Sequence, residues 1–71
     1  MSRFSKGDTV AWSWGRGEGK GEVAEVFTRR VKRRIKGREI TRNGSRARPA
    51  YLIRQDDGDR VLKLDSELSR P

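Results

Sequence analysis

The sequence predicts an all-β fold, a small antiparallel barrel of five to six short strands. Apolar residues recur in short alternating runs, and Gly, Asp and Asn residues separate these runs at regular spacing, which is typical of a folded β domain. No segment combines the length of a helix with a 3.6-residue period. The chain has 71 residues, enough for one domain with one small core, so residues 1–71 are expected to form a single unit.

The first two expected strands lie on either side of a glycine-rich stretch. In residues 9–14, Val10, Trp12 and Trp14 fall at period two and share one face of a strand. Residues 15–21 alternate glycine with charged residues, and four glycines in seven residues predict a flexible loop. Residues 21–27 form the second strand. Apolar residues occupy both of its faces, which predicts a central position in the sheet or a β-bulge.

A long basic β-hairpin is expected next. Its strands cover residues 31–34 and 38–41, and the turn lies at Lys36-Gly37. Asn43-Gly44 marks a second turn. Residues 42–48 contain almost no apolar side chain, which indicates a looser loop that ends at Pro49.

The last third of the sequence contains a second hairpin. Residues 50–53 and 60–64 form its strands, Pro49 suits the start of the first of them, and Asp57-Gly58 supplies the turn. Residues 65–68 are expected to form one closing helical turn, with Asp65 or Ser66 as its cap.

Positive charge is concentrated between positions 29 and 48, which we call the basic segment. Ten of the eighteen Lys and Arg residues lie there: Arg29, Arg30, Lys32, Arg33, Arg34, Lys36, Arg38, Arg42, Arg46 and Arg48. Glu39 is the one acid among them, so the segment carries +9, the whole chain +8 and the remainder −1. Clustered cations favour anionic partners, because their contacts with phosphates release condensed counterions. The alternative is a solvated surface that keeps a small protein soluble.

The sequence contains no residues suited to the commonest kinds of site chemistry. Cysteine and histidine are both absent, so we expect no disulfide, no metal, no cofactor and no catalytic residues. The glycine stretch has neither the Gly-Lys-Ser/Thr end of a phosphate-binding loop nor the spacing of a dinucleotide fingerprint. The aspartates at 56, 57 and 59 lack the closing glutamate of a calcium loop.

Neither a secretory signal nor a membrane span is expected. Polar and charged residues follow Met1, and no apolar run approaches the roughly 20 residues that span a membrane. We therefore expect a cytoplasmic protein with no membrane partner. Asn43-Gly44-Ser45 matches a glycosylation acceptor, but without a secretory signal we interpret it as a turn.

The aromatic residues divide between core and surface roles. A small domain needs its large side chains inside, so Trp12 and Phe27 are expected in the core. Trp14 and Tyr51 can keep a polar tip in water, which makes them candidates for stacking on bases or for a cage around a cation. Trp14 is the stronger stacking candidate, because Arg16 and the glycine stretch follow it.

Motifs along nearly the whole chain resemble the hypervirulence-associated Tudor-domain family, a group of small and mostly bacterial proteins of unknown function. These motifs are Phe4-Ser5-Lys6-Gly7-Asp8, Val10-Ala11-Trp12, Gly21-Glu22-Val23, Ile35-Lys36-Gly37, Arg42-Asn43-Gly44-Ser45, Pro49-Ala50-Tyr51-Leu52-Ile53 and Gln55-Asp56-Asp57-Gly58-Asp59-Arg60-Val61-Leu62-Lys63. The resemblance implies an SH3-like, Tudor-type barrel and no particular activity.

Two further expectations depend on the resemblance. Tudor-type barrels often bind methylated Lys or Arg in an aromatic cage, but a chain of net charge +8 would repel a cationic tail. In the family, acidic residues often occupy the positions of Arg29, Arg30, Arg46 and Arg48. The resemblance therefore implies that the basic charge is particular to this chain.

The sequence as a whole predicts a non-enzymatic binding module. Its ten cations in the basic segment would contact the phosphates of RNA or DNA without strong sequence preference, with Trp14 as a stacking residue. The alternative is a protein-interaction module in which a groove of the barrel, with Trp14 and Tyr51, takes a peptide or an acidic partner. The choice between RNA and DNA, and the oligomeric state, are left open.

Overall fold

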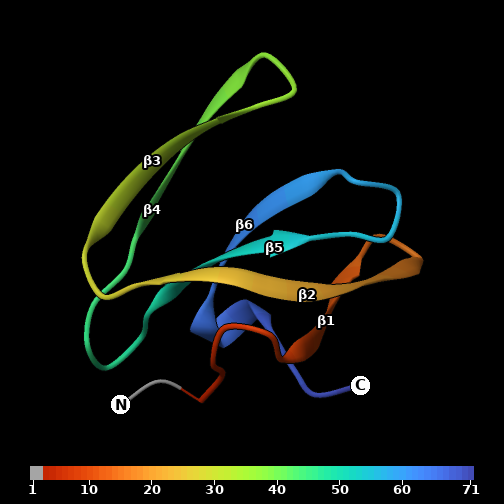
Figure 1. Ribbon diagram of the computed structural model, residues 1–71, viewed down its shortest axis with the longest axis horizontal. Helices are drawn as coiled ribbons and strands as arrows, with labels where there is room; N and C mark the ends of the chain where they lie inside the picture. Colours follow the sequence, from red (N-terminus) through yellow and green to blue (C-terminus); the bar gives the residue numbers. More distant parts are fainter. Residues whose placement is uncertain (1–2) are drawn as a thin grey trace.

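The computed structural model describes residues 3–71, which form six β-strands and one short 3-10 helix (Figure 1). The strands are β1 (Thr9–Trp14), β2 (Gly17–Phe27), β3 (Arg30–Ile35), β4 (Arg38–Asn43), β5 (Ala50–Arg54) and β6 (Arg60–Leu64), and the 3-10 helix is η1 (Asp65–Glu67). All strand pairs are antiparallel. No helix in this part of the chain is long and apolar enough to cross a membrane.

The strands form a curled four-stranded sheet and a separate hairpin. The order in the sheet is β1-β2-β5-β6, and β3 and β4 form a two-stranded sheet of their own (Figure 1). After η1 the chain returns to the free edge of β1, where Ala11 and Ser69 exchange backbone hydrogen bonds of 2.9 and 2.8 Å. The arrangement is a small SH3-like, Tudor-type barrel, which confirms the fold class expected from the sequence.

Strand β5 is buried on both faces and separates two small hydrophobic cores. On one face, Tyr51 and Ile53 pack with Phe4, Val10, Trp12, Val23 and Leu68. On the other face, Ala50 and Leu52 pack with Phe27, Val31, Ile35 and Leu62. The hairpin therefore covers one face of the sheet, because Val31 and Ile35 belong to the second core. Trp12 and Phe27 are both buried, as expected.

The glycine stretch is strand from Gly17 onward, so the flexible loop expected over residues 15–21 is wrong. Only Gly15 and Arg16 connect β1 to β2, and the positive φ of 47° at Gly15 suits the first central position of a two-residue turn. Beyond it, Gly19 lies opposite Trp12 and Gly17 opposite Trp14. Each indole covers its partner, since a Cβ on Gly19 would lie 2.4 Å from the Trp12 ring. Glycine is needed here to make room for a cross-strand aromatic ring.

Strand β2 has both features that its apolar pattern predicts. It lies between β1 and β5, and its register with β5 shifts between Val23 and Glu25. Ala24 is the extra residue of this β-bulge. The bulge bends the strand, so that apolar residues before and after Ala24 in the sequence can both point inward.

The basic hairpin turns at Lys36-Gly37, as predicted. Both residues have positive φ, 52° and 75°, which is the requirement of a type I′ turn. Strand β4 continues to Asn43, so Arg42 is part of the hairpin and not of the loop in which the sequence placed it. The second predicted hairpin is also present, with Gly58 at φ 88° in the turn between β5 and β6.

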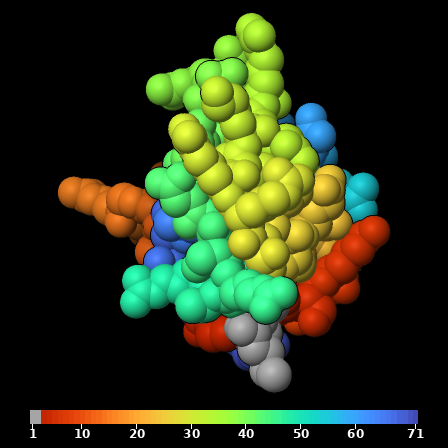
Figure 2. Space-filling model, turned by 90° about the vertical axis from the view of Figure 1, so that its left-hand side faces the viewer, coloured from red at the N-terminus to blue at the C-terminus, as the bar shows by residue number. Residues whose placement is uncertain are grey.

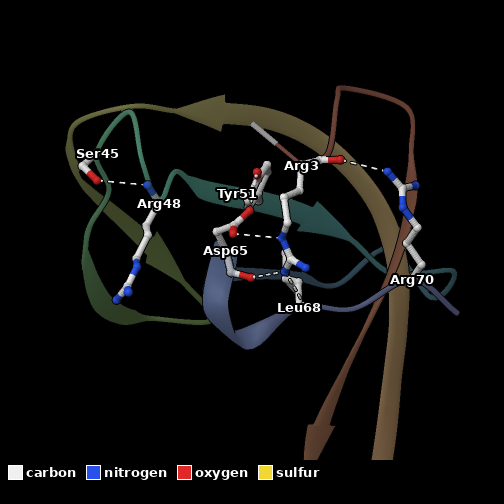
Figure 3. A network of polar contacts seen from close by, with 7 residues as sticks. All are labelled: Arg3, Ser45, Arg48, Tyr51, Asp65, Leu68 and Arg70. Carbon is white, nitrogen blue, oxygen red and sulfur yellow. Dashed lines mark hydrogen bonds and ion pairs between the residues drawn. The ribbon is translucent and has the colours of Figure 1, made fainter. Parts of the chain in front are cut away.

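The buried carboxylate of Asp65 ties both ends of the chain to β5 (Figure 3). Its Oδ1 accepts a hydrogen bond of 2.9 Å from the Tyr51 hydroxyl, and its Oδ2 accepts one of 3.0 Å from Arg3 Nε. Arg3 also donates to the carbonyl oxygens of Asp65 and Leu68, at 2.7 and 2.8 Å. The closing helical turn is present, but the expected cap is not, since the Asp65 side chain points inward and Glu67 accepts the Leu64 N–H at 2.9 Å.

The two glycines opposite tryptophans provide a matched test of the sheet. We expect Gly19→Ala to lower the free energy of unfolding by about 1–3 kcal/mol, because the ring of buried Trp12 cannot move away. Gly17→Ala should cost less than about 1 kcal/mol, because Trp14 is 61% exposed and can rotate into water. Urea denaturation of the two variants measures the difference, and equal losses would contradict this account.

The phenol of Tyr51 should make stability fall at high pH. Burial, and after it the hydrogen bond to Asp65, raise the pKa of Tyr51 above its ordinary 10.0. The unfolded chain therefore loses this proton first, so the contribution of Tyr51 is complete below pH 10 and is lost as the pH rises through the folded-state pKa. Tyr51→Phe should cost about 1.5–3 kcal/mol at neutral pH. Urea denaturation should show that the difference in the free energy of unfolding between Tyr51→Phe and the wild type narrows above pH 10. A difference that stays constant with pH would contradict the role given to the Tyr51 hydroxyl.

Candidate nucleic-acid interface

Strand β3 divides its side chains between the core and the solvent. Val31 and Ile35 point inward and are buried, while Arg30, Lys32 and Arg34 occupy the opposite, exposed face. Successive side chains of a strand point to opposite faces, so these three cations lie in one row at intervals of about 6.6 Å. That interval is comparable to the separation of successive phosphates along one nucleic-acid strand.

The loop of residues 44–49 presents two more cations beside this row. Ser45 and Arg48 close a tight turn, in which Ser45 N donates to Arg48 O at 3.0 Å and Arg48 N donates to Ser45 Oγ at 3.1 Å (Figure 3). Arg46 and Arg48 are exposed, whereas Pro49 is buried and holds the end of the loop against the barrel. The loop begins next to β3, since Asn43 pairs with Arg30.

The hairpin and this loop lie on one side of the molecule. Figure 2 shows residues 29–44, from yellow to green, across the middle and top of this side and the teal loop below them. We call the exposed cations of this side the basic face: Arg30, Lys32, Arg34, Arg46 and Arg48.

Two cations of the basic segment cover the core. The guanidinium of Arg33 lies 4.8 Å from the centre of the Phe27 ring, and that of Arg29 lies 6.0 Å from it. Both distances are within the range of a cation–π contact. These arginines shield a buried aromatic ring, and they have less freedom than the basic face to follow a ligand.

Acidic side chains partly neutralise three other cations of the segment. Lys36 Nζ lies 2.7 Å from Asp59 Oδ2, Arg42 Nε lies 3.6 Å from Glu67 Oε1, and Lys32 Nζ lies 3.7 Å from Glu39 Oε1. The hydrogen bond to Asp59, followed by its charge, raises the pKa of Lys36. The charge of +9 therefore overstates the field at the hairpin, because the fold brings Asp59 and Glu67 to it from outside the segment.

The fold also adds cations that the sequence analysis did not include. Arg60 and Lys63 on β6 line a groove together with Arg38 and Arg42 on β4. The exposed Arg38 lies directly after the turn, opposite Ile35. The sequence placed Arg60 and Lys63 on a strand, but no local signal indicates that this strand faces the basic hairpin.

The two aromatic candidates have different environments. Tyr51 is fully buried and its hydroxyl is bound to Asp65, so its ring is not accessible for stacking or for a cage. Trp14 is exposed, but it lines a hollow in which the carboxylates of Glu18, Asp56 and Asp57 outnumber the single cation, Lys20. These carboxylates would repel a phosphate chain.

The basic face and the hollow of Trp14 lie in different parts of the molecule. Figure 1 shows the 44–49 loop and the base of the hairpin at one end, and the β1–β2 and β5–β6 turns, which carry the hollow of Trp14, at the other. Within residues 3–71, no three acidic side chains gather in a way that could hold a metal ion.

The sequence matches the family described as hypervirulence associated proteins TUDOR domain over residues 7–68. The match includes all six strands and η1, and the chain belongs to this family. Neither a curated protein nor a solved structure matches the chain. Membership indicates a small binding module and does not identify the ligand.

The ion pair between Lys36 and Asp59 can be tested by titration. Asp59→Asn should lower the pKa of Lys36, because the hydrogen bond and charge of Asp59 are what raise it. Asp56→Asn is the matched control, since it removes the same charge from the same turn. NMR titration of the lysine side chains measures the pKa of Lys36 in both variants. A pKa of Lys36 that does not change in Asp59→Asn would show that the ion pair does not form in solution.

Proposed function

We propose that this member of the Tudor-domain family binds nucleic acid through its basic face, without strong sequence preference. The observation that carries the proposal is the row of Arg30, Lys32 and Arg34 on the exposed side of β3, beside the turn that exposes Arg46 and Arg48. These side chains project from strands and a hydrogen-bonded turn, so their spacing is set before a ligand arrives.

The chemistry of these side chains suits phosphates. Lys and Arg contacts with phosphates position a nucleic acid but carry no sequence information, which is why we expect weak sequence preference. Adding Arg38, at the end of the hairpin, gives about six phosphate contacts. Such a number predicts that affinity falls roughly a thousandfold between about 50 and 200 mM salt.

We expect removal of the row on β3 to weaken this binding. The triple variant Arg30→Gln, Lys32→Gln, Arg34→Gln should bind a fluorescent oligonucleotide less tightly at low salt. It should also reduce the slope of log K against log salt by about two to three, because three phosphate contacts are lost. Fluorescence anisotropy at several salt concentrations, with RNA and DNA, gives both quantities.

The matched control removes the same charge elsewhere. Lys6→Gln, Arg16→Gln, Lys20→Gln changes three exposed cations outside the basic segment and leaves the net charge equal to that of the first variant. We expect this control to keep nearly the salt slope of the wild type. Equal slopes in the two triple variants would mean that net charge alone drives binding, and absence of binding at low salt would refute the proposed function.

The exposed Trp14 favours a second candidate function. A tryptophan that is 61% exposed beside acidic residues suits a protein partner with a basic, apolar surface. A pull-down from nuclease-treated lysate distinguishes the two functions. Partners that survive nuclease and are lost in Trp14→Ala support this candidate, while a high 260/280 nm absorbance ratio of the purified protein supports nucleic acid.

A further inference from the structure

A groove separates the basic hairpin from the edge of the four-stranded sheet. It lies between β4 and β6, which belong to different sheets and share no strand pairing within residues 3–71. Its volume is about 230 Å³. Pockets for drug-sized ligands measure about 300–1,000 Å³, so this groove has the size for one small ring system.

The floor of the groove is aliphatic. Ile35 and Leu62 at its base are buried in the second core, and Ile40 from β4, which packs against that core, is half-buried and keeps part of its surface in contact with solvent. Binding is favoured when the apolar face of a ligand covers apolar surface of this kind and removes it from water. Among residues 3–71, no acidic side chain lines the groove.

The rim of the groove is cationic on both sides. Lys36, Arg38 and Arg42 come from the hairpin, and Arg60 and Lys63 come from β6. Asp59 neutralises Lys36, and Glu67 lies within 4 Å of both Arg42 and Lys63, whereas Arg38 and Arg60 have no carboxylate within 4 Å in the described chain. The complementary ligand therefore has an apolar part about the size of one ring system, with negative charge next to it.

We infer that the groove between β4 and β6 holds one base of a single-stranded nucleic acid, with the adjacent phosphates on Arg38 and Arg60. This inference rests on the proposed function, and it goes further by assigning a site for the base and a preference for single strands. A nucleobase offers planar apolar faces, and the phosphates on either side of it would reach the rim. In a duplex the bases are paired and stacked, so only the phosphates would remain for the basic face.

A comparison of two oligonucleotides with equal charge tests the inference. One is a 12-nucleotide single strand of thymidines, and the other is a strand of the same length and phosphate count in which every base is absent. Anisotropy titrations should show the normal strand binding on the order of tenfold more tightly, the gain expected from removing some tens of Å² of apolar surface from water.

Two matched variants locate the bases. Ile40→Thr replaces a half-buried aliphatic residue of the groove with a β-branched polar one, and it should reduce the difference between the two strands to less than about twofold. Val26→Thr makes a similar change at a half-buried residue that packs on the first core, on the other side of the sheet, and it should keep the difference. Circular dichroism checks that both variants fold.

Each other outcome has a definite meaning. Equal affinity for the two strands would overturn the base site and leave the proposed function intact, whereas absence of binding to either strand at low salt would refute both. A difference that persists in Ile40→Thr would place the bases elsewhere, with Trp14 the first residue to test. An alternating Glu-Val peptide that binds more tightly than the baseless strand, and that loses binding in Ile40→Thr, would assign the groove to a protein ligand instead.

Discussion

The structure depends on one strand of five residues that is buried on both faces. Without a disulfide, a chain of 71 residues must gain its stability from a small amount of apolar surface, and β5 contributes to both cores at once. Tyr51 and Ile53 hold the N-terminal segment and Leu68, while Ala50 and Leu52 hold the hairpin. The position of the basic hairpin is thus set by the second core, in which Val31 and Ile35 pack with residues of β5 and β6.

The position of β5 also accounts for the place of the buried Asp65 carboxylate. Tyr51 extends to the edge of the first core, and its hydroxyl needs a partner there because a buried donor without one is costly. Asp65 supplies it, and Arg3 neutralises Asp65, so one hydrogen-bonded set joins β5 to both terminal segments. Every buried side-chain nitrogen and oxygen in residues 3–71 has a partner. The binding surfaces proposed above lie outside this set.

Local signals in the sequence predicted β1 and both hairpins, because alternation and turns such as Lys36-Gly37 and Asp57-Gly58 act within a few residues. The sequence predicted β2 only from residue 21 and not its extension over residues 17–20, since the reason for Gly17 and Gly19 is a tryptophan on the neighbouring strand. The composition of the basic segment was evident, but its partial neutralisation by Asp59 and Glu67 was not. The groove requires Arg60 and Leu62 of β6 to lie on the side of the sheet that the hairpin covers, which only the tertiary fold determines.

The alternation along β3 places different constraints on the inward and outward side chains of one strand. Val31 and Ile35 are constrained by the second core, whereas Arg30, Lys32 and Arg34 are exposed on the opposite face. A change in the sign of the outer charges would therefore leave the fold nearly as stable. The hairpin can serve as an exchangeable recognition element on a constant scaffold, and proteins with this barrel can diverge in ligand without diverging in structure.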